Sequence, residues 1–200
     1  MNSFPNELED LIERLARFPG VGRRSAERIA FYILKMKEKD ATELAKNIDA
    51  VHKTIKPCRI CNNFSTQEIC PVCANPKRDK EIVCIVEEPK DILAIEKTSQ
   101  YEGVYYVLLG SISPLEGIGP ESLSIGKLLN RLRKGEIKEV IISTDADNEG
   151  ELTAQFLIEQ ISRYKVKLYR IGIGIPLGIQ IEYIDSATLG RAFLERRPVT

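Results

Sequence analysis

Four cysteines stand in two closely spaced pairs near the middle of the chain: Cys58, Cys61, Cys70 and Cys73. Each Cys-x2-Cys pair places two thiols on one tight turn, and Zn²⁺ prefers four such ligands in a tetrahedron. The surrounding segment, residues 57–80, is too short and polar to build its own core, so a bound metal would organise it. Unrelated buried cysteines and a redox pair are the alternatives, and the double pairing favours a structural zinc site.

Acidic residues crowd the stretch STDADNEGE, residues 143–151, directly after an apolar run. A strand predicted at 139–144 would place Asp145 and Asp147 at the carboxyl edge of a parallel sheet, where open α/β sheets bind ligands. Glu87 follows an earlier predicted strand and is expected at the same edge. Carboxylates meeting there would suit Mg²⁺, which takes oxygen ligands, but acidic loops also occur at strand ends without a metal.

The other polar residues of this stretch have structural explanations. Asn148 is expected to cap the next helix, and Glu151, three residues later, would complete a capping box. Glu149 would gain from the positive end of the helix dipole. Asp145 and Asp147 have no comparable structural role in the sequence pattern, and these two carry the metal interpretation.

A helix–hairpin–helix pattern near the N-terminus predicts DNA binding. In FPGVGRRSAERIA, residues 18–30, the turn glycines Gly20 and Gly22 let the backbone approach a ligand, and the next helix begins with free N–H groups. Three basic side chains follow the turn: Arg23, Arg24 and Arg28. Such groups contact phosphates and read no base sequence, so binding would be non-specific and salt-dependent. The alternative is an ordinary helix corner with a solvated basic face.

The elements around these motifs predict an α/β multidomain chain. Helical periodicity covers residues 7–18 and 24–37, and a third helix is expected at 40–55. From residue 81 strands alternate with helices, which predicts a mostly parallel sheet. Strands are expected at 81–86, 104–109, 139–144 and 166–172, with helices at 90–98, 124–134 and 149–162. A last helix is expected outside the sheet, started by Asp185 or Ser186.

Four domains follow from this order: a helical head at 1–56, the zinc finger at 57–80, the parallel-sheet domain at 81–176 and a C-terminal segment with its helix at 177–200. Lys plus Arg and Asp plus Glu both total 29, so net charge indicates no polyanionic partner. Between residues 11 and 39, however, eight basic residues face three acidic ones. No run is apolar enough to be a secretory signal or to span a bilayer, and five cysteines in this pattern favour metal binding in a reducing compartment, so we expect a cytoplasmic protein.

The acid pattern resembles a known domain, and the whole chain resembles a known family. A glutamate after the first strand and Asp-x-Asp after a later one are similar to the Toprim domain of topoisomerases and bacterial primases. The order helix–hairpin–helix, four-cysteine zinc finger, Toprim, then GIPLGIQIEYID resembles the bacterial recombination protein family RecR over nearly all of the chain. The quoted turn, CNNFSTQEICPVC, VEEPKDILAIEKT and YEGVYYVLLGSISPLEGIGPESL match the pattern of that family in sequence and order.

The resemblance implies a recombination mediator in DNA repair that works with RecO and RecF to load RecA on single-stranded or gapped DNA. It also implies homo-oligomeric rings, tetramers that encircle DNA, with the basic helix–hairpin–helix residues facing the hole. It carries DNA contacts to Arg23, Arg24 and Arg28, zinc ligands to the four cysteines, and Toprim acids to Glu87, Asp145, Asp147 and Glu149. Family members often have Asn-Pro-Thr at 145–147, so the acid set is fuller here.

Enzymatic functions remain as alternatives because of that fuller set. A type IA topoisomerase needs a tyrosine nucleophile presented by further domains around a DNA gate. A primase also joins a zinc module to a Toprim domain, but that module usually includes histidine, and His52 lies before the cysteines. The expected protein is therefore a non-catalytic adaptor. A Mg²⁺-dependent Toprim enzyme, primase-like or a nuclease, is the alternative.

Overall fold

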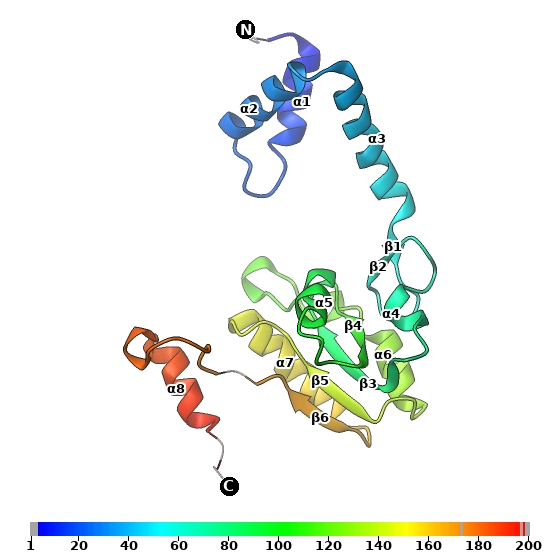
Figure 1. Ribbon diagram of the computed structural model, residues 1–200, viewed down its shortest axis with the longest axis vertical. Helices are drawn as coiled ribbons and strands as arrows, with labels where there is room; N and C mark the ends of the chain where they lie inside the picture. Colours follow the sequence, from blue (N-terminus) through cyan, green and yellow to red (C-terminus); the bar gives the residue numbers. More distant parts are fainter. Residues whose placement is uncertain (1–3, 173, 197, 199–200) are drawn as a thin grey trace. The chain divides into compact units, whose positions relative to one another are not determined.

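The computed structural model describes residues 4–172, 174–196 and 198. The outer ends of the first and last predicted domains lie outside these residues. Two compact units make up the chain, Met1–Ile55 and Lys56–Thr200. Each unit has a distinct architecture, and the polypeptide passes from the first to the second at the end of a long helix (Figure 1).

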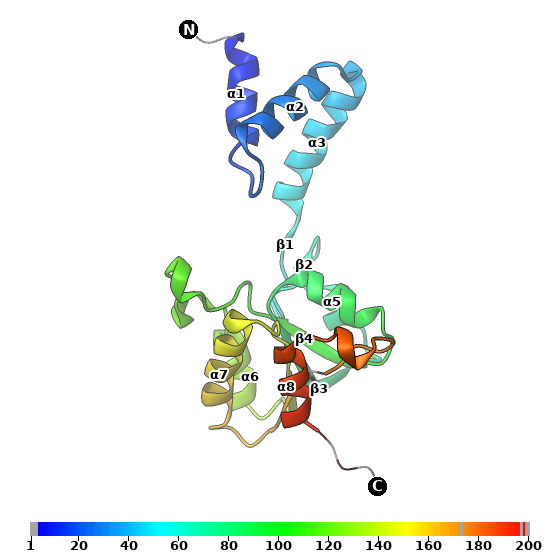
Figure 2. The ribbon, with the colours of Figure 1, turned by 90° about the vertical axis from the view of Figure 1, so that its left-hand side faces the viewer.

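The smaller unit contains three helices, as the periodicity predicts: α1 (Asn6–Leu15), α2 (Arg23–Leu34) and α3 (Glu38–Thr54). Helices α1 and α2 pack closely (Figure 2) because small alanines face the crossing: Ala26 and Ala30 are fully buried against Ile12. Helix α3 has no buried residue. The helical hairpin thus has a small, tight core of its own.

The larger unit begins with the cysteine-rich segment. Short strands β1 (Lys56–Pro57) and β2 (Phe64–Ser65) pair antiparallel, and a one-turn helix, α4 (Pro71–Ala74), follows. These elements have little hydrophobic interior apart from the cysteines themselves. The segment therefore depends on its sulfur cluster and on its contacts with the neighbouring sheet.

A four-stranded, all-parallel sheet forms the centre of the larger unit, in the order β4-β3-β5-β6. Its strands are β3 (Asp79–Val86), β4 (Gly103–Val107), β5 (Glu139–Ile142) and β6 (Lys167–Arg170). The connecting helices are α5 (Pro89–Glu96), α6 (Gly126–Arg133) and α7 (Asn148–Ile161). The predicted alternation of strand and helix is confirmed.

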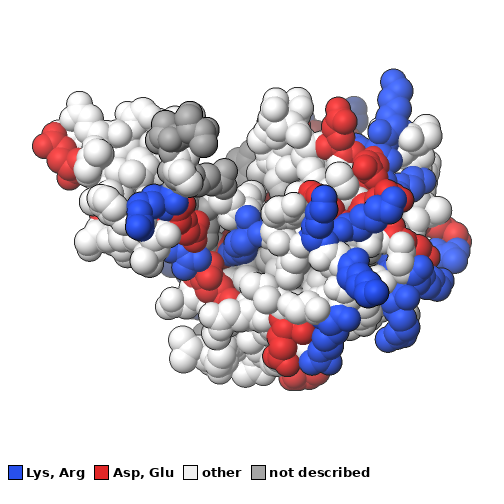
Figure 3. All heavy atoms as spheres, turned by 90° about the horizontal axis from the view of Figure 1, so that it is seen from below, with Lys and Arg blue, Asp and Glu red and all other residues white. Residues whose placement is uncertain are grey.

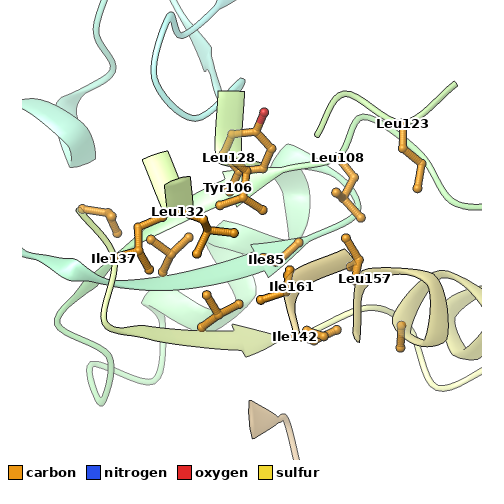
Figure 4. Packing of buried hydrophobic residues seen from close by; sticks show 14 of the residues in the cluster. Ile85, Tyr106, Leu108, Leu123, Leu128, Leu132, Ile137, Ile142, Leu157 and Ile161 are labelled. Atoms are coloured by element: carbon orange, nitrogen blue, oxygen red, sulfur yellow. The ribbon is translucent and has the colours of Figure 1, made fainter. Parts of the chain in front are cut away.

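Alternate side chains of the strands face two different cores. Ile85, Tyr106 and Ile142 lie under α6 and α7 (Figure 4), where Leu128 of α6 and Leu157 of α7 pack against them. On the opposite face Cys84, Val86 and Tyr105 pack against Ile92 of α5, with Val72 of α4 at the border. Helix α5, with Val72 of α4 at its border, therefore covers one face of the sheet, and α6 and α7 cover the other.

Three strands end earlier than the sequence predicts: the one expected at 166–172 stops at Arg170, and the other two stop beside the acidic stretch. The strand expected at 104–109 stops at Val107, since Leu109 has a left-handed φ of 66° and its N–H donates to the carbonyl of Glu87. The strand expected at 139–144 stops at Ile142, and the carbonyl of Thr144 accepts from the Arg170 guanidinium instead of from a strand. Both changes lie at the carboxyl edge of the sheet, beside the acidic stretch.

The chain ends with helix α8 (Ser186–Leu194), in which no residue is buried. Asp185 caps it, as predicted, by accepting the Thr188 N–H at 2.9 Å. Among the described residues, none of the helices is both long and apolar enough to cross a bilayer.

Candidate nucleic-acid interface and metal centre

The turn between α1 and α2 exposes the start of a helix. Gly20 has a φ of 74°, which favours glycine, and the Val21 N–H closes the turn on the Phe18 carbonyl at 3.0 Å. Gly22 occupies the N-cap position, and no side-chain hydrogen bond caps the helix there. The first N–H groups of α2 are therefore available to an anion.

The three arginines that follow this turn differ in their surroundings. Arg23 contacts the carboxylate of Glu9 on α1 and lies 3.4 Å from that of Glu27. The hydrogen bond from Arg23 to Glu9 raises the pKa of Arg23. Within the described part of the chain, Arg24 and Arg28 make no ion pair. These two side chains offer uncompensated positive charge, whereas that of Arg23 is largely neutralised within the hairpin.

A shallow groove along α2 extends the basic surface beyond the turn. Arg24 and Arg28 line it together with Lys35, the exposed Tyr32 and one acid, Glu27, and its volume is about 460 Å³. Lys35 lies seven residues after Arg28, which returns it to nearly the same helix face. The sequence pattern pointed only to the turn. The helical spacing of 24, 28 and 35 was the signal that could have added Lys35.

The four cysteines converge as the spacing predicts. Their Sγ atoms all lie within 4.8 Å of one another, and those of Cys61 and Cys70 are 3.6 Å apart. A tetrahedron with the usual Zn–S distance of about 2.3 Å has edges of about 3.8 Å. All four side chains are buried. The donor set and its spacing therefore fit a closed Zn²⁺ site.

Backbone N–H groups and neighbouring thiols create a setting for thiolates. The N–H groups of Ile60 and Cys70 approach Cys58 Sγ at 3.5 and 3.3 Å. A hydrogen bond with Cys61 lowers the pKa of Cys70, while the same contact raises that of Cys61. Without a cation only part of the set can ionise, so a divalent metal is the natural partner of the full cluster.

Asn62 attaches the zinc-finger segment to the sheet. Its backbone has a left-handed φ of 62°, and its side-chain nitrogen donates to the carbonyl of Val107 at 3.0 Å. Its side-chain oxygen accepts from Lys127 Nζ on α6 at 3.0 Å. The N–H of Val107 also donates to the Cys61 carbonyl at 2.8 Å. A movement of the cysteine cluster would therefore shift the hydrogen-bond partners of the edge strand β4.

Glu87 is the buried member of the acidic set. Only 8% of the residue is exposed, and its Oε1 accepts the backbone N–H of Asp145 at 3.1 Å. Burial raises the pKa of Glu87 to about 7; the hydrogen bond from Asp145 opposes that shift, and the nearby charges of Asp145 and Asp147 add to it. The predicted meeting of Glu87 with the acidic loop is observed.

Asp147, and not Asn148, caps helix α7. Its Oδ1 accepts the Gly150 N–H at 2.8 Å, and the helix begins one residue later. The expected Asn148 cap is wrong because either residue type can cap, and the chain places the aspartate at the turn. Asp147 therefore has a structural role, as the N-cap of α7, that the sequence analysis did not assign to it. Glu149 accepts a hydrogen bond from Ser113 Oγ.

Arg170, which the sequence pattern did not single out, holds the acidic loop in place. Its guanidinium donates to the carbonyls of Ile142 and Thr144 at 3.2 and 2.9 Å and to that of Asp145 at 3.2 Å. It also pairs with Glu151 at 3.1 Å, and Arg191 approaches the same carboxylate at 3.7 Å. The expected capping box of Glu151 is therefore replaced by an ion pair with a neighbouring strand.

The acids do not converge as the cysteines do. Within residues 4–172, 174–196 and 198, the four cysteines are the one group of three or more potential metal-binding side chains whose ligand atoms come together. Asp145 and Asp147 are exposed, and the other two acids accept hydrogen bonds from the protein. The acidic stretch is thus an anchored surface loop at the sheet edge.

Known protein families match the chain segment by segment. A family model described as RecR helix-hairpin-helix matches residues 8–52, and one described as the RecR four-cysteine zinc finger domain matches residues 55–75. The Toprim domain model matches residues 81–172, and a RecR C-terminal model matches residues 174–197. These matches follow one another in the order in which the structural elements occur.

Similar full-length proteins bear the name recombination protein RecR. The one from Moorella thermoacetica is 47% identical over 194 residues, covering 96% of this chain and 97% of that protein. The one from Tropheryma whipplei strain TW08/27 is 44% identical over 190 residues, covering 95% and 96%. The chain belongs to the RecR family. The suspected resemblance is therefore confirmed, and the likeness extends over the hairpin, the finger, the sheet and the tail.

Membership of the RecR family agrees with the predicted architecture. The helix–hairpin–helix, the four-cysteine finger and the Toprim sheet are all present in the structure and in the family matches. The RecR finger model covers the cysteine cluster, which supports zinc as its metal. This RecR-family chain is a recombination protein, and repair and DNA binding are consistent with that class.

Proposed function

We propose that this protein is a DNA-binding recombination mediator, an adaptor that acts on DNA without changing it chemically. The observation that carries the proposal is the open start of α2 beside Arg24 and Arg28. Free N–H groups at a helix start attract a phosphate, and unpaired guanidinium groups add charge at short range. Contacts of this kind bind the backbone of single- or double-stranded DNA without reading bases. Gly20, Gly22 and Arg23 complete this proposed contact set.

The environment of the Toprim acids supports the absence of catalysis. Glu87, Asp147 and Glu149 each accept a hydrogen bond from the protein, and these bonds hold the carboxylates in structural roles. Asp145 is exposed at the tip of the loop. We propose that Asp145, Asp147 and Glu149, in a loop held by the buried Glu87, form a contact surface for a basic partner or for hydrated Mg²⁺, and that any bound Mg²⁺ modulates such contacts.

Family likeness extends the proposal to partners. We assign RecO and RecF as the proteins that act with this chain, and RecA loading on gapped or single-stranded DNA as the outcome, because the whole RecR order of domains is present. The four cysteines would hold one structural Zn²⁺. Since the proposed substrate is chromosomal DNA, we assign the protein to the cytoplasm.

Exposed apolar side chains support assembly into a homo-oligomer, a dimer or a tetrameric ring that encircles DNA. On α3 the residues Leu44, Ile48 and Val51 recur at helical spacing, and each is at least 40% exposed. Leu177, near the C-terminal end, is fully exposed. Apolar stripes of this kind are usually covered by another surface. A second copy of the chain is the covering surface in this proposal.

A comparison of DNA before and after binding tests the proposal. Supercoiled and single-stranded DNA are incubated with the protein, Mg²⁺ and nucleotides, and run on gels before and after the protein is stripped away. The adaptor function predicts retarded DNA that returns unchanged, with retardation shifted to higher protein concentration in an Arg24→Ala/Arg28→Ala variant. Nicks, relaxation or new primers that vanish in Asp145→Asn would instead establish the Mg²⁺-dependent enzyme and overturn the proposal.

A further inference from the structure

A basic pocket lies within the larger unit, between the zinc-finger segment and helix α6. Its volume is about 580 Å³. Five of the side chains that line it are cationic and one is anionic: Arg59, Lys80, Lys127, Arg131 and Lys134, with Glu136. In the space-filling view of Figure 3, many Lys and Arg side chains lie on the right-hand side, with some Asp and Glu side chains among them. In a chain without net charge, this is a local concentration of positive charge.

The positive charge of the pocket is only partly compensated: Arg59 pairs with Glu68 at 2.9 Å. Arg131 and Lys134 share the single carboxylate of Glu136, at 3.4 and 3.8 Å. Lys127 contacts only the neutral side chain of Asn62. Lys80 makes no ion pair with any residue that the structure describes. Among the described residues, Lys80 and Lys127 are thus the two pocket cations without a carboxylate partner, and an anion in the pocket would meet both.

Arg131 gives a second, independent indication of a ligand. Its side chain is only 16% exposed, and its Nη2 donates to the Lys80 carbonyl at 3.2 Å. Its Nη1 is buried and has no hydrogen-bond partner among the described residues. A buried N–H without an acceptor costs free energy, and charged donors cost most. A rotation of the guanidinium toward the pocket would let an oxygen-rich anion supply the missing acceptor.

We propose that this pocket binds phosphate groups of a DNA strand, as a contact region separate from the helix–hairpin–helix. The inference deepens the proposed DNA-binding function and rests on it. The cations come from the zinc finger, the start of β3 and α6, a spread that suits successive phosphates of a strand better than one free phosphate. The pocket floor is aliphatic, with Ile60 and Val104, and the ten lining residues include no aromatic ring on which a base could stack. Binding there is therefore directed at the backbone.

A pair of charge-reversal variants tests the pocket. Lys80→Glu/Lys134→Glu changes two exposed pocket residues, and Lys97→Glu/Lys165→Glu makes the same change of charge at exposed sites outside it. The measurement is fluorescence anisotropy of a labelled single-stranded oligonucleotide at several salt concentrations. We expect the pocket variant to bind at least about tenfold more weakly than the control variant. Its slope of log K against log salt should fall by about 1.4, since two single-strand phosphate contacts contribute about 0.7 each. Equal affinity and equal slope in the two variants would overturn the inference.

A photo-crosslinking residue at position 130 separates the pocket from the hairpin. Asn130 is an exposed residue of the pocket lining, and the crosslinker is introduced in the otherwise unchanged full chain and in the Arg24→Ala/Arg28→Ala background. The inference predicts a crosslink to the labelled strand in both. DNA binding without a crosslink at position 130 would refute the pocket as a DNA contact and leave the proposed DNA-binding function in place. Absence of all DNA binding would refute both the pocket contact and the proposed function. A mononucleotide competitor gives the last control. If it abolishes the crosslink at concentrations that leave oligonucleotide binding intact, the pocket binds a free nucleotide, and the proposal that it binds a DNA strand is wrong.

Discussion

Glu87 and Asp145 are joined across two neighbouring strand ends: Glu87 Oε1 accepts the Asp145 backbone N–H at 3.1 Å. Glu87 follows β3 directly, and Asp145 begins the acidic loop after β5. This bond ties the buried carboxyl to the loop backbone and leaves the Asp145 side chain exposed. The position of the loop therefore depends, together with the Arg170 contacts, on a carboxyl group whose pKa lies near neutrality.

Substitution of Glu87 by Gln should change how stability depends on pH. Burial raises the pKa of Glu87 from 4.5 to about 7 in the folded protein. Between these two pH values the Glu87 carboxyl is ionised in the unfolded chain and protonated in the folded protein. Wild-type stability therefore falls as pH rises from 4.5 to 7. Glu87→Gln keeps an acceptor for Asp145 and cannot ionise. The mutant should therefore gain stability relative to the wild type as pH rises. The difference between its free energy of unfolding and that of the wild type should be about 1–3 kcal/mol larger at about pH 8 than at about pH 5.

Urea denaturation at several pH values measures this difference. The exposed Glu102→Gln is the matched control and should follow the wild type at every pH. Because all three proteins keep the same cysteines, the pH dependence of metal binding cancels in the comparison. Parallel curves for Glu87→Gln and the wild type would refute the role of the buried carboxyl.

Asp147 should contribute to stability through its cap and not through its charge. Asp147→Ala removes the acceptor of the Gly150 N–H and should lower the free energy of unfolding by about 1 kcal/mol. Asp147→Asn keeps a good capping side chain and should stay within about 0.5 kcal/mol of the wild type. Asp145→Ala, at an exposed position, is the control, and its free energy of unfolding should also stay within about 0.5 kcal/mol of the wild type. Equal losses for the Ala and Asn variants at 147 would point to the charge instead.

The sequence predicted the elements that depend on local pattern. Periodicity located the helices and strands, and the Cys-x2-Cys spacing located a cluster whose sulfurs do meet. The carboxyl-edge rule correctly brought Glu87 to the acidic loop, because parallel neighbours end at the same edge. These predictions needed only the chain order and the geometry of a parallel sheet.

Partners far apart in the chain could not be predicted in this way. Arg170 reaches the carbonyls of residues 142–145 only because β6 pairs with β5, and nothing near residue 170 signals that role. Similarly, Glu9 neutralises Arg23 because α1 and α2 pack in one particular register. The cap at Asp147 was missed by a single position, since adjacent Asp and Asn are equally good caps.

Gly150 should not tolerate a side chain. A Cβ built there would lie 2.0 Å from the carbonyl oxygen of Asp145, which is backbone and cannot rotate away. Gly150→Ala should therefore lower the free energy of unfolding by about 2 kcal/mol or more, despite the better helix propensity of alanine. Gly126→Ala, at a helical position with open space around the new Cβ, is the control and should be neutral or stabilising. Thermal unfolding compares the two, and equal melting temperatures would refute the close contact.

Removal of the metal should destabilise the finger and the adjacent sheet edge. The purified protein should contain one Zn²⁺ per chain by atomic absorption, and a strong chelator should lower its unfolding midpoint because the cluster is the main interior of this segment. Cys70→Ser should lose the zinc. Cys84→Ser, which keeps a hydrogen-bond donor to Ser143, should retain it. Full zinc content in Cys70→Ser would contradict the four-sulfur site.

The arginines of the hairpin should contribute unequally to DNA binding. Arg23 is engaged by Glu9, so Arg23→Ala removes charge that is already compensated within the protein. Arg24→Ala and Arg28→Ala each remove an uncompensated charge from the groove along α2. On duplex DNA each of the latter two should weaken binding several-fold and lower the slope of log K against log salt by about 0.9, with a smaller change for Arg23→Ala.

Glu9→Gln provides the reciprocal test on the same hairpin. It removes the Glu9 contact of Arg23 without removing a cation and leaves the Glu27 pair at 3.4 Å, so duplex affinity should rise, and a subsequent Arg23→Ala change should then cost more than it does in the wild type. Anisotropy titrations at matched salt measure all of these proteins. If Arg23→Ala alone is the most damaging substitution, the Glu9 pair does not persist on DNA, and Arg23 is the principal phosphate contact.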